Sequence, residues 1–156
     1  MNSIDSTNRR ILNILQEQGA ITNAELAARI GLSPATVFER VKKLEKSGIL
    51  RRYVGLVDLE KVGKSIIAFV FLTLNEYTSE AIEYLSEEVR KMPEVLECYR
   101  ISGEKDYLLK VVADDIPTYD RFVFHKLGRL SHVGKFTTMF ALSTVKYQTK
   151  VSLADE

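Results

Sequence analysis

Residues 32–48, LSPATVFERVKKLEKSG, decide how the N-terminal part of this chain folds. Ser33 is a preferred helix-capping residue, and Pro34 suits the first helical position because the N–H that it lacks needs no partner there. Gly48 supplies the left-handed conformation that ends many helices. The apolar positions between them recur at helical spacing: Val37, Val41 and Leu44. The stretch therefore predicts a helix over residues 34–47 that buries one face.

Two further helices are predicted ahead of this one. Thr22 and Glu25 form a capping box that opens a short helix, and the turn at residues 31–33 ends it. An earlier helix over residues 6–18 has Asp5 or Ser6 as its cap and carries an apolar stripe. Because a turn of three residues joins the last two helices, the arrangement is a helix-turn-helix unit and the third helix is its predicted recognition helix.

Basic side chains cluster on and just after this third helix. Within residues 40–52 six basic residues accompany a single acidic one, although the whole chain has a net charge of only +1. The basic residues are Arg40, Lys42, Lys43, Lys46, Arg51 and Arg52, and the acidic one is Glu45. Such a local patch is compatible with nucleic-acid binding, but by charge alone an ordinary solvated helix face would look the same.

The first residues of a recognition helix meet base edges, whereas basic residues beyond them meet phosphates. Thr36 and Glu39 are therefore the predicted base readers, with Ala35 exposed beside them. Phe38 either packs on a thymine methyl or shelters part of the core, and Arg40 reaches a guanine or a phosphate. The predicted phosphate contacts are Ser33, Lys42, Lys43, Lys46, Arg51 and Arg52. Double-stranded DNA is thus the expected partner.

From residue 65 onward the pattern predicts an α+β domain. Strands are expected at residues 65–74, 95–102, 106–113 and 133–143, and helices at 79–92 and 116–130. This βαββαβ order is the ferredoxin-like arrangement. Residues 49–58 resemble a linker strand, and residues 144–150 resemble one more strand. The predicted domains are a winged-type helix-turn-helix domain (1–50), a linker strand and hinge (51–64), and a ferredoxin-like domain (65–156).

One face of a ferredoxin-like sheet is left without helices. Depending on strand register, that open face would expose aromatic side chains of the first and last strands: Phe69, Phe71, Phe136 or Phe140. Apolar surface contributes roughly 25 cal/mol per Å² when it is removed from water, so a second copy of the same sheet is the simplest cover. The alternative is that the linker and the C-terminal tail cover the face within one chain.

Other classes of protein find little support. The two histidines, His125 and His132, have no cysteine or carboxylate partner at metal-ligand spacing, Glu87-Glu88 is more typical of a solvated helix, and the glycines form no phosphate loop. No enzyme and no cofactor are therefore expected. A single cysteine, Cys98, excludes an intrachain disulfide and is expected to be a buried thiol. With no apolar run long enough for a membrane span and no signal peptide, the sequence predicts a cytoplasmic protein.

Several stretches together resemble the Lrp/AsnC family of bacterial and archaeal transcription regulators. They are residues 5–15, 32–45, 48–50, 93–98, 102–109 and 145–146. The resemblance covers almost the whole chain in the right order. It departs from many relatives at Ala20-Ile21, where they carry an arginine and this chain lacks that possible phosphate contact.

The resemblance implies a nucleoid-associated regulator that dimerises through its ferredoxin-like domain and assembles further into octamers of four dimers. It also implies a small amino-acid effector bound between dimers. The matching residues are Ser102, Gly103, Glu104, Asp106 and Tyr107, with Thr137 and Thr138 along the same cleft. Free amides around Gly103 suit a carboxylate and Asp106 suits an ammonium group. The alternatives are a plain hairpin turn at this loop and, for the whole chain, a protein-binding adaptor or an enzyme's regulatory subunit.

Overall fold

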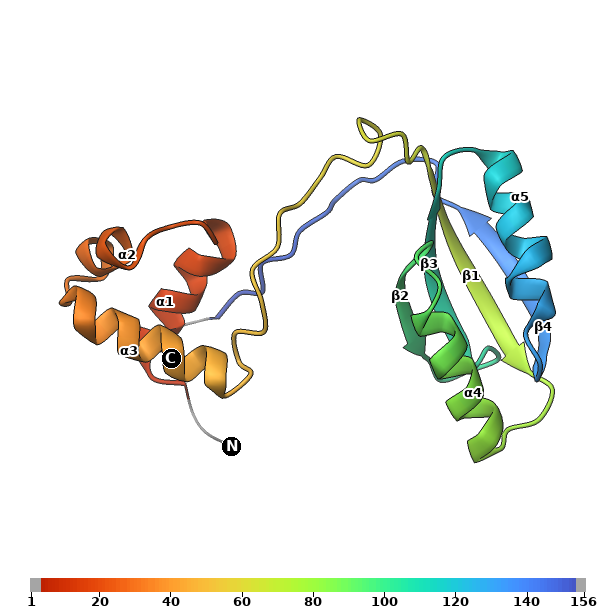
Figure 1. The fold of residues 1–156 in the computed structure, drawn as a ribbon, viewed down its shortest axis with the longest axis horizontal. Helices are drawn as coiled ribbons and strands as arrows, with labels where there is room; N and C mark the ends of the chain where they lie inside the picture. The colour runs from red at the N-terminus through yellow and green to blue at the C-terminus, as the bar shows by residue number, and fades with distance from the viewer. Residues whose placement is uncertain (1–3, 154–156) are drawn as a thin grey trace. The chain divides into compact units, whose positions relative to one another are not determined.

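The computed structural model describes residues 4–153, and it divides the chain into two compact units (Figure 1). The first contains residues 4–56 together with the tail from residue 146, and the second contains residues 57–145. The sequence had suggested boundaries at residues 50 and 65 and a tail that belonged to the sheet domain. The structure instead groups the tail with the helices, because residues 150–153 hydrogen-bond to the first helix.

The first unit contains the three predicted helices, α1 (Ser6–Glu17), α2 (Asn23–Ile30) and α3 (Pro34–Lys46). Each begins at a side-chain cap. The Asp5 carboxylate accepts the Asn8 amide at 2.7 Å, and Thr22 and Glu25 form the reciprocal capping box. Gly31 ends α2 at φ 80°, a conformation that suits glycine. The helices enclose one core: Ile11, Leu12, Leu15, Leu26, Ala27, Ile30, Val37, Val41 and Leu44.

The second unit has the predicted ferredoxin-like order. Its elements are β1 (Ile66–Leu74), α4 (Ser79–Arg90), β2 (Val95–Arg100), β3 (Tyr107–Ala113), α5 (Ile116–His125), a short 3-10 turn (Leu127–Arg129) and β4 (Val133–Phe140). The strands form one antiparallel sheet in the order β2-β3-β1-β4. Alternate β1 residues Ala68, Val70 and Leu72 are buried against α4 and α5, so both helices cover the same face.

Strand register decides which aromatic side chains lie on the open face. Phe69 and Phe71 alternate with the buried residues of β1 and therefore lie on the face without helices. Phe136 and Phe140 pair with Leu72 and Ala68, so they lie on the helix side, where the Phe140 ring is 5.1 Å from that of Tyr119. Two of the four predicted aromatics are thus on the open face. Met139, opposite Phe69, joins them there.

The linker forms no strand in the described chain, and neither do residues 141–153. A strand is defined by hydrogen bonds to a neighbouring strand, and the extended residues 51–58 have no such neighbour here. The predicted linker strand is therefore extended backbone that forms no hydrogen-bonded pair with another strand. Large apolar side chains along both segments are exposed, with Leu142 and Val145 almost fully so.

Candidate nucleic-acid interface and ligand site

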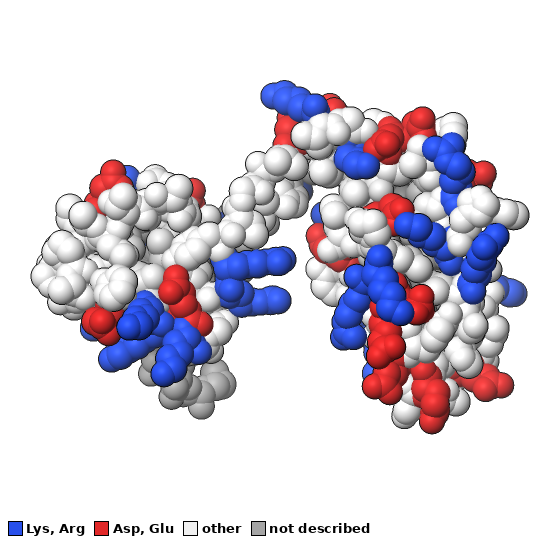
Figure 2. All heavy atoms as spheres, in the orientation of Figure 1, with Lys and Arg blue, Asp and Glu red and all other residues white. Residues whose placement is uncertain are grey.

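The third helix presents the predicted DNA-reading side chains to solvent. Residues at its start and along its outer face are exposed: Ser33, Ala35, Thr36, Phe38, Glu39, Lys42, Lys43 and Lys46. The hydroxyls of Ser33 and Thr36 lie 2.8 Å apart, and the Thr36 amide donates to Ser33 Oγ. Figure 2 shows lysine and arginine side chains gathered along α3 and the segment after it. Arg51 and Arg52, in that segment, are also exposed.

Phe38 lies on the surface of the helical unit. Its side chain is 49% exposed, so it does not fill the core. The Lys42 ammonium lies 5.8 Å from the centre of its ring, a favourable cation–π distance. A half-exposed ring fits both interpretations of Phe38, because it can cover part of the core and still offer a surface to a partner.

Arg40 is engaged within the helical unit. Its Nη1 donates to the Asp5 carboxylate at 2.7 Å and to the Asn8 side-chain oxygen at 3.1 Å. The pKa of Asp5 is lowered most by the hydrogen bond from Arg40 and next by the hydrogen bond from the Asn8 amide. Arg40 therefore ties the middle of α3 to the start of α1. The sequence predicted that Arg40 reaches a guanine or a phosphate because of its place on the third helix. The contact with Asp5 was not predicted, because the two residues lie 35 positions apart in the chain and local periodicity does not reveal such a contact.

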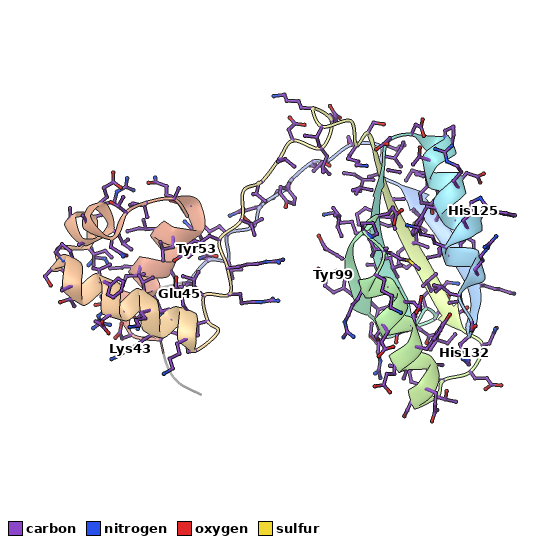
Figure 3. All side chains as sticks on the ribbon, viewed as in Figure 1. Lys43, Glu45, Tyr53, Tyr99, His125 and His132 are labelled. Atoms are coloured by element: carbon purple, nitrogen blue, oxygen red, sulfur yellow. The ribbon has the colours of Figure 1, made fainter. Side chains whose placement is uncertain are left out.

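Tyr53 is a residue that the sequence reasoning missed. Its hydroxyl donates to Glu45 Oε1 at 3.2 Å, and its ring packs against Gly19 (Figure 3). Burial, and then the hydrogen bond to Glu45, raise the pKa of Tyr53 to about 12. Tyr53 thus holds the segment that carries Arg51 and Arg52 against the end of α3. An aromatic residue directly after a basic pair was the only sequence feature that pointed to it.

The hairpin loop between β2 and β3 carries the predicted ligand residues. Ser102, Gly103 and Glu104 are exposed, and Gly103 has φ 121°, a conformation that favours glycine. Asp106 is fixed by three bonds: its Oδ2 accepts the Leu74 amide at 2.8 Å, its amide donates to Leu72 O, and its carbonyl accepts the Ile101 amide. Within residues 4–153 its Oδ1 accepts no hydrogen bond. The loop therefore holds a half-paired carboxylate in a fixed position.

The remaining predicted ligand residues do not share one surface. Thr137 pairs with Phe71 and lies on the open face, whereas Thr138 points the other way, its hydroxyl 2.5 Å from that of Tyr119. Tyr107 is 4% exposed and also points to the helix side. Consecutive strand residues alternate between faces, so the two threonines cannot line one cleft from the same side.

Residues 4–153 show neither a metal-binding cluster nor a helix that could span a membrane. No group of three or more histidine, cysteine or acidic side chains is placed to hold a metal ion, and no helix is long and apolar enough to cross a bilayer. Figure 3 shows that His125 and His132 come from different parts of the sheet unit. Cys98, expected to be buried, is exposed because it lies on β2, an edge strand.

Both units match known protein families. Residues 67–151 match the model of the Lrp/AsnC ligand-binding domain, and residues 4–51 match a winged helix-turn-helix DNA-binding model. The transcriptional regulator AzlB of Bacillus subtilis is 34% identical over 150 residues, which cover 96% of each chain. The leucine-responsive regulatory protein of Escherichia coli is 36% identical over 148 residues, or 95% of this chain and 90% of that protein. The chain belongs to the Lrp/AsnC family.

Solved structures agree with this membership. A transcriptional regulator from Neisseria meningitidis, solved in complex with L-methionine, superposes with a TM-score of 0.90 at 36% identity over 96% of each chain. An AsnC-family regulator from Agrobacterium tumefaciens gives 0.89 at 37% identity, covering 94% of this chain and 95% of the other. This Lrp/AsnC protein is accordingly a transcription regulator with a DNA-binding domain and a ligand-binding domain, and not an enzyme.

Proposed function

We propose that this Lrp/AsnC regulator reads DNA through the exposed side of α3 and responds to a small amino acid bound at the loop of residues 102–106. The observation that carries the proposal is the fixed Asp106 carboxylate, whose Oδ1 accepts no hydrogen bond within residues 4–153. It belongs to the same loop as the exposed residues 102–104, whose main-chain amides are the proposed donors. A zwitterion needs this pairing of an acceptor for its ammonium group and donors for its carboxylate. The L-methionine bound to the Neisseria relative supports an amino-acid effector.

In the proposed DNA complex, Thr36 and Glu39 contact base edges and Phe38 contacts a thymine methyl. Ser33 and Ala35 lie at the start of α3, which we place close to the sugar-phosphate backbone of the DNA. The phosphate contacts come from Lys42, Lys43, Lys46, Arg51 and Arg52. Arg40 is left out of this set because it already binds Asp5 and Asn8.

A homodimer through the open sheet face is the proposed basic assembly. Phe69, Phe71 and Met139 share that face, and none of the helices within residues 4–153 covers it. The exposed apolar side chains after β4, such as Leu142 and Val145, offer further area for a second copy. Two-fold symmetry would then present two recognition helices to half-sites about one helical turn apart. We also propose that four dimers form an octamer, which acts on the nucleoid in the cytoplasm of a bacterium or archaeon.

An effector acts only through a difference in affinity between two states of the protein. The direct experiment is a thermal-shift screen of the full-length protein against the twenty amino acids. At 100 times its dissociation constant, a ligand adds roughly 2.7 kcal/mol to the free energy of unfolding. The matched variant Asp106→Asn keeps the shape of the side chain and removes its charge, so it should abolish the shift. An unchanged shift in Asp106→Asn, or no shift with any amino acid, would rule out the loop as the effector site.

A further inference from the structure

A groove of about 500 Å³ runs between α4 and the edge strand β2 on the helix side of the sheet. It exists because α4 directs Ala81, Leu85 and Val89 into the core and leaves β2 uncovered. β2 is exposed along most of its length as a result. A volume of this size is in the range of small-molecule sites.

The Tyr107 hydroxyl is the unusual feature of this groove. Tyr107 is 4% exposed and lines the groove, yet its buried hydroxyl has no hydrogen-bond partner in the described chain. Native proteins pair nearly all buried polar groups, so an unpaired one points to a missing partner. The neighbouring Asp106 does not supply it: its Oδ2 accepts the Leu74 amide, and its Oδ1 accepts no hydrogen bond within residues 4–153.

The charge of the groove is positive. Arg90 lines it from α4 and Arg100 from β2, and within residues 4–153 neither forms an ion pair. Arg100 is held over the Tyr77 ring at 5.3 Å, which positions its guanidinium without neutralising it. Glu97 is the acidic residue in the lining, and its carboxylate binds Lys110 and Tyr99. The groove therefore suits an anion, and the acidic side chain in its lining is already paired with Lys110 and so less suited to an ammonium group.

Apolar side chains complete the lining. Ile82 and Val89 come from α4 and Leu96 from β2, where it is 49% exposed. We propose that this groove is a second ligand site, separate from the loop of residues 102–106, for a small carboxylate with an apolar chain and no ammonium group. The carboxylate binds Arg90 and Arg100 and accepts a hydrogen bond from Tyr107, and the chain lies against the apolar wall.

The test uses two probes with one carbon skeleton, 4-methylpentanoate and L-leucine, which differ by the ammonium group. Binding to the full-length protein is measured by calorimetry and by NMR of the Ile82, Val89 and Leu96 methyl groups. We expect 4-methylpentanoate to shift these methyl signals in a saturable manner, and L-leucine to leave them unchanged. Tyr107→Phe and Arg100→Gln should each raise the dissociation constant about tenfold.

The matched controls are Tyr119→Phe, which removes a hydroxyl already paired with Thr138, and Arg121→Gln, which removes a charge on α5. Neither should change binding. The proposal is overturned if no saturable shift occurs at about 10 mM probe, if Tyr107→Phe binds as tightly as the wild type, or if L-leucine shifts the same methyl signals. If Asp106→Asn abolishes a response to L-leucine while the methyl signals of Ile82, Val89 and Leu96 stay unchanged, that response is assigned to the loop of residues 102–106. The groove proposal therefore does not depend on the amino-acid screen.

Discussion

Arg40 donates a 2.7 Å hydrogen bond to the carboxylate of Asp5, so the middle of the recognition helix is tied to the cap of α1. We expect Arg40→Gln to lower the stability of the helical unit by about 0–1 kcal/mol, the usual contribution of an exposed ion pair. Its effect on DNA affinity should be smaller than that of Lys43→Gln. Thermal melts and fluorescence anisotropy with promoter DNA check both expectations, and equal losses of affinity would return Arg40 to the DNA interface.

The same pair predicts a pH dependence. The Arg40 bond, and then the Asn8 amide, hold the pKa of Asp5 below its usual value of 3.8. Because the folded-state pKa is lowered, the stabilisation is present above the unfolded-state pKa and is lost as pH falls through the folded-state value. Asp5→Asn should therefore destabilise the protein at pH 7 and lose most of that effect near pH 3. Urea melts at the two pH values measure the difference, and an equal effect at both would contradict the ion pair.

Experiments should distinguish the residues of α3 that contact bases from those that contact phosphates. Glu39→Gln and Thr36→Ala should change which base is preferred at one position of the half-site, by about 1–3 kcal/mol. Lys43→Gln or Lys46→Gln should weaken binding to all sequences alike and reduce the slope of log affinity against log salt by about one. Binding to a library of half-site variants at two salt concentrations distinguishes them. A uniform loss in the Glu39 variant would remove it from the base readers.

Local signals in the sequence were enough for most of the fold. The capping box at Thr22, the cap at Ser33 and the stop at Gly31 act over a few residues, so the helix-turn-helix could be predicted from them. The βαββαβ order followed from apolar runs and turn residues in the same way. The family resemblance then supplied the loop of residues 102–106, which composition alone did not distinguish from a plain hairpin turn.

Long-range geometry accounts for what the sequence missed. A bulge between Leu72 and Leu74 shifts the register of β1 against β4, and periodicity cannot locate a bulge, so Phe136 and Phe140 could not be assigned to a face in advance. The engagement of Arg40 by Asp5 depends on how two helices pack. Thr137 and Thr138 were predicted together from the resemblance, although strand alternation places them on opposite faces.

The open sheet face gives a prediction about assembly. Phe71 sits mid-strand on β1, between Leu108 and Thr137 of the neighbouring strands. Phe71→Lys would bury a charge in a face-to-face dimer, so it should shift the protein to monomers. Phe124→Lys is the control, because Phe124 is 69% exposed on α5. Light scattering after size-exclusion chromatography reports the mass, and an unchanged mass in Phe71→Lys would place the dimer interface elsewhere.

The C-terminal tail is held on α1 by the side chain of Gln16, which bonds to both backbone groups of Val151. Gln16 Nε2 donates to Val151 O at 3.1 Å, and the Val151 amide donates to Gln16 Oε1 at 2.8 Å. Asn13 adds a bond to Leu153 O at 3.3 Å, and Lys150 pairs with Glu17. The segment that follows β4 is therefore attached to the helical unit through these contacts. This attachment is additional to the linker that follows α3.

Gln16→Ala should release this attachment. It removes both bonds to Val151, each of which contributes about 0.5–1.5 kcal/mol, so the Val151 amide should exchange with solvent at least about fivefold faster. Gln18→Ala is the matched control, because its side chain has no hydrogen bond in the described chain. Hydrogen exchange followed by NMR measures the Val151 amide directly. If exchange is equally fast in the wild type and in Gln16→Ala, the tail does not dock on α1 in solution, and the linker alone connects the two units.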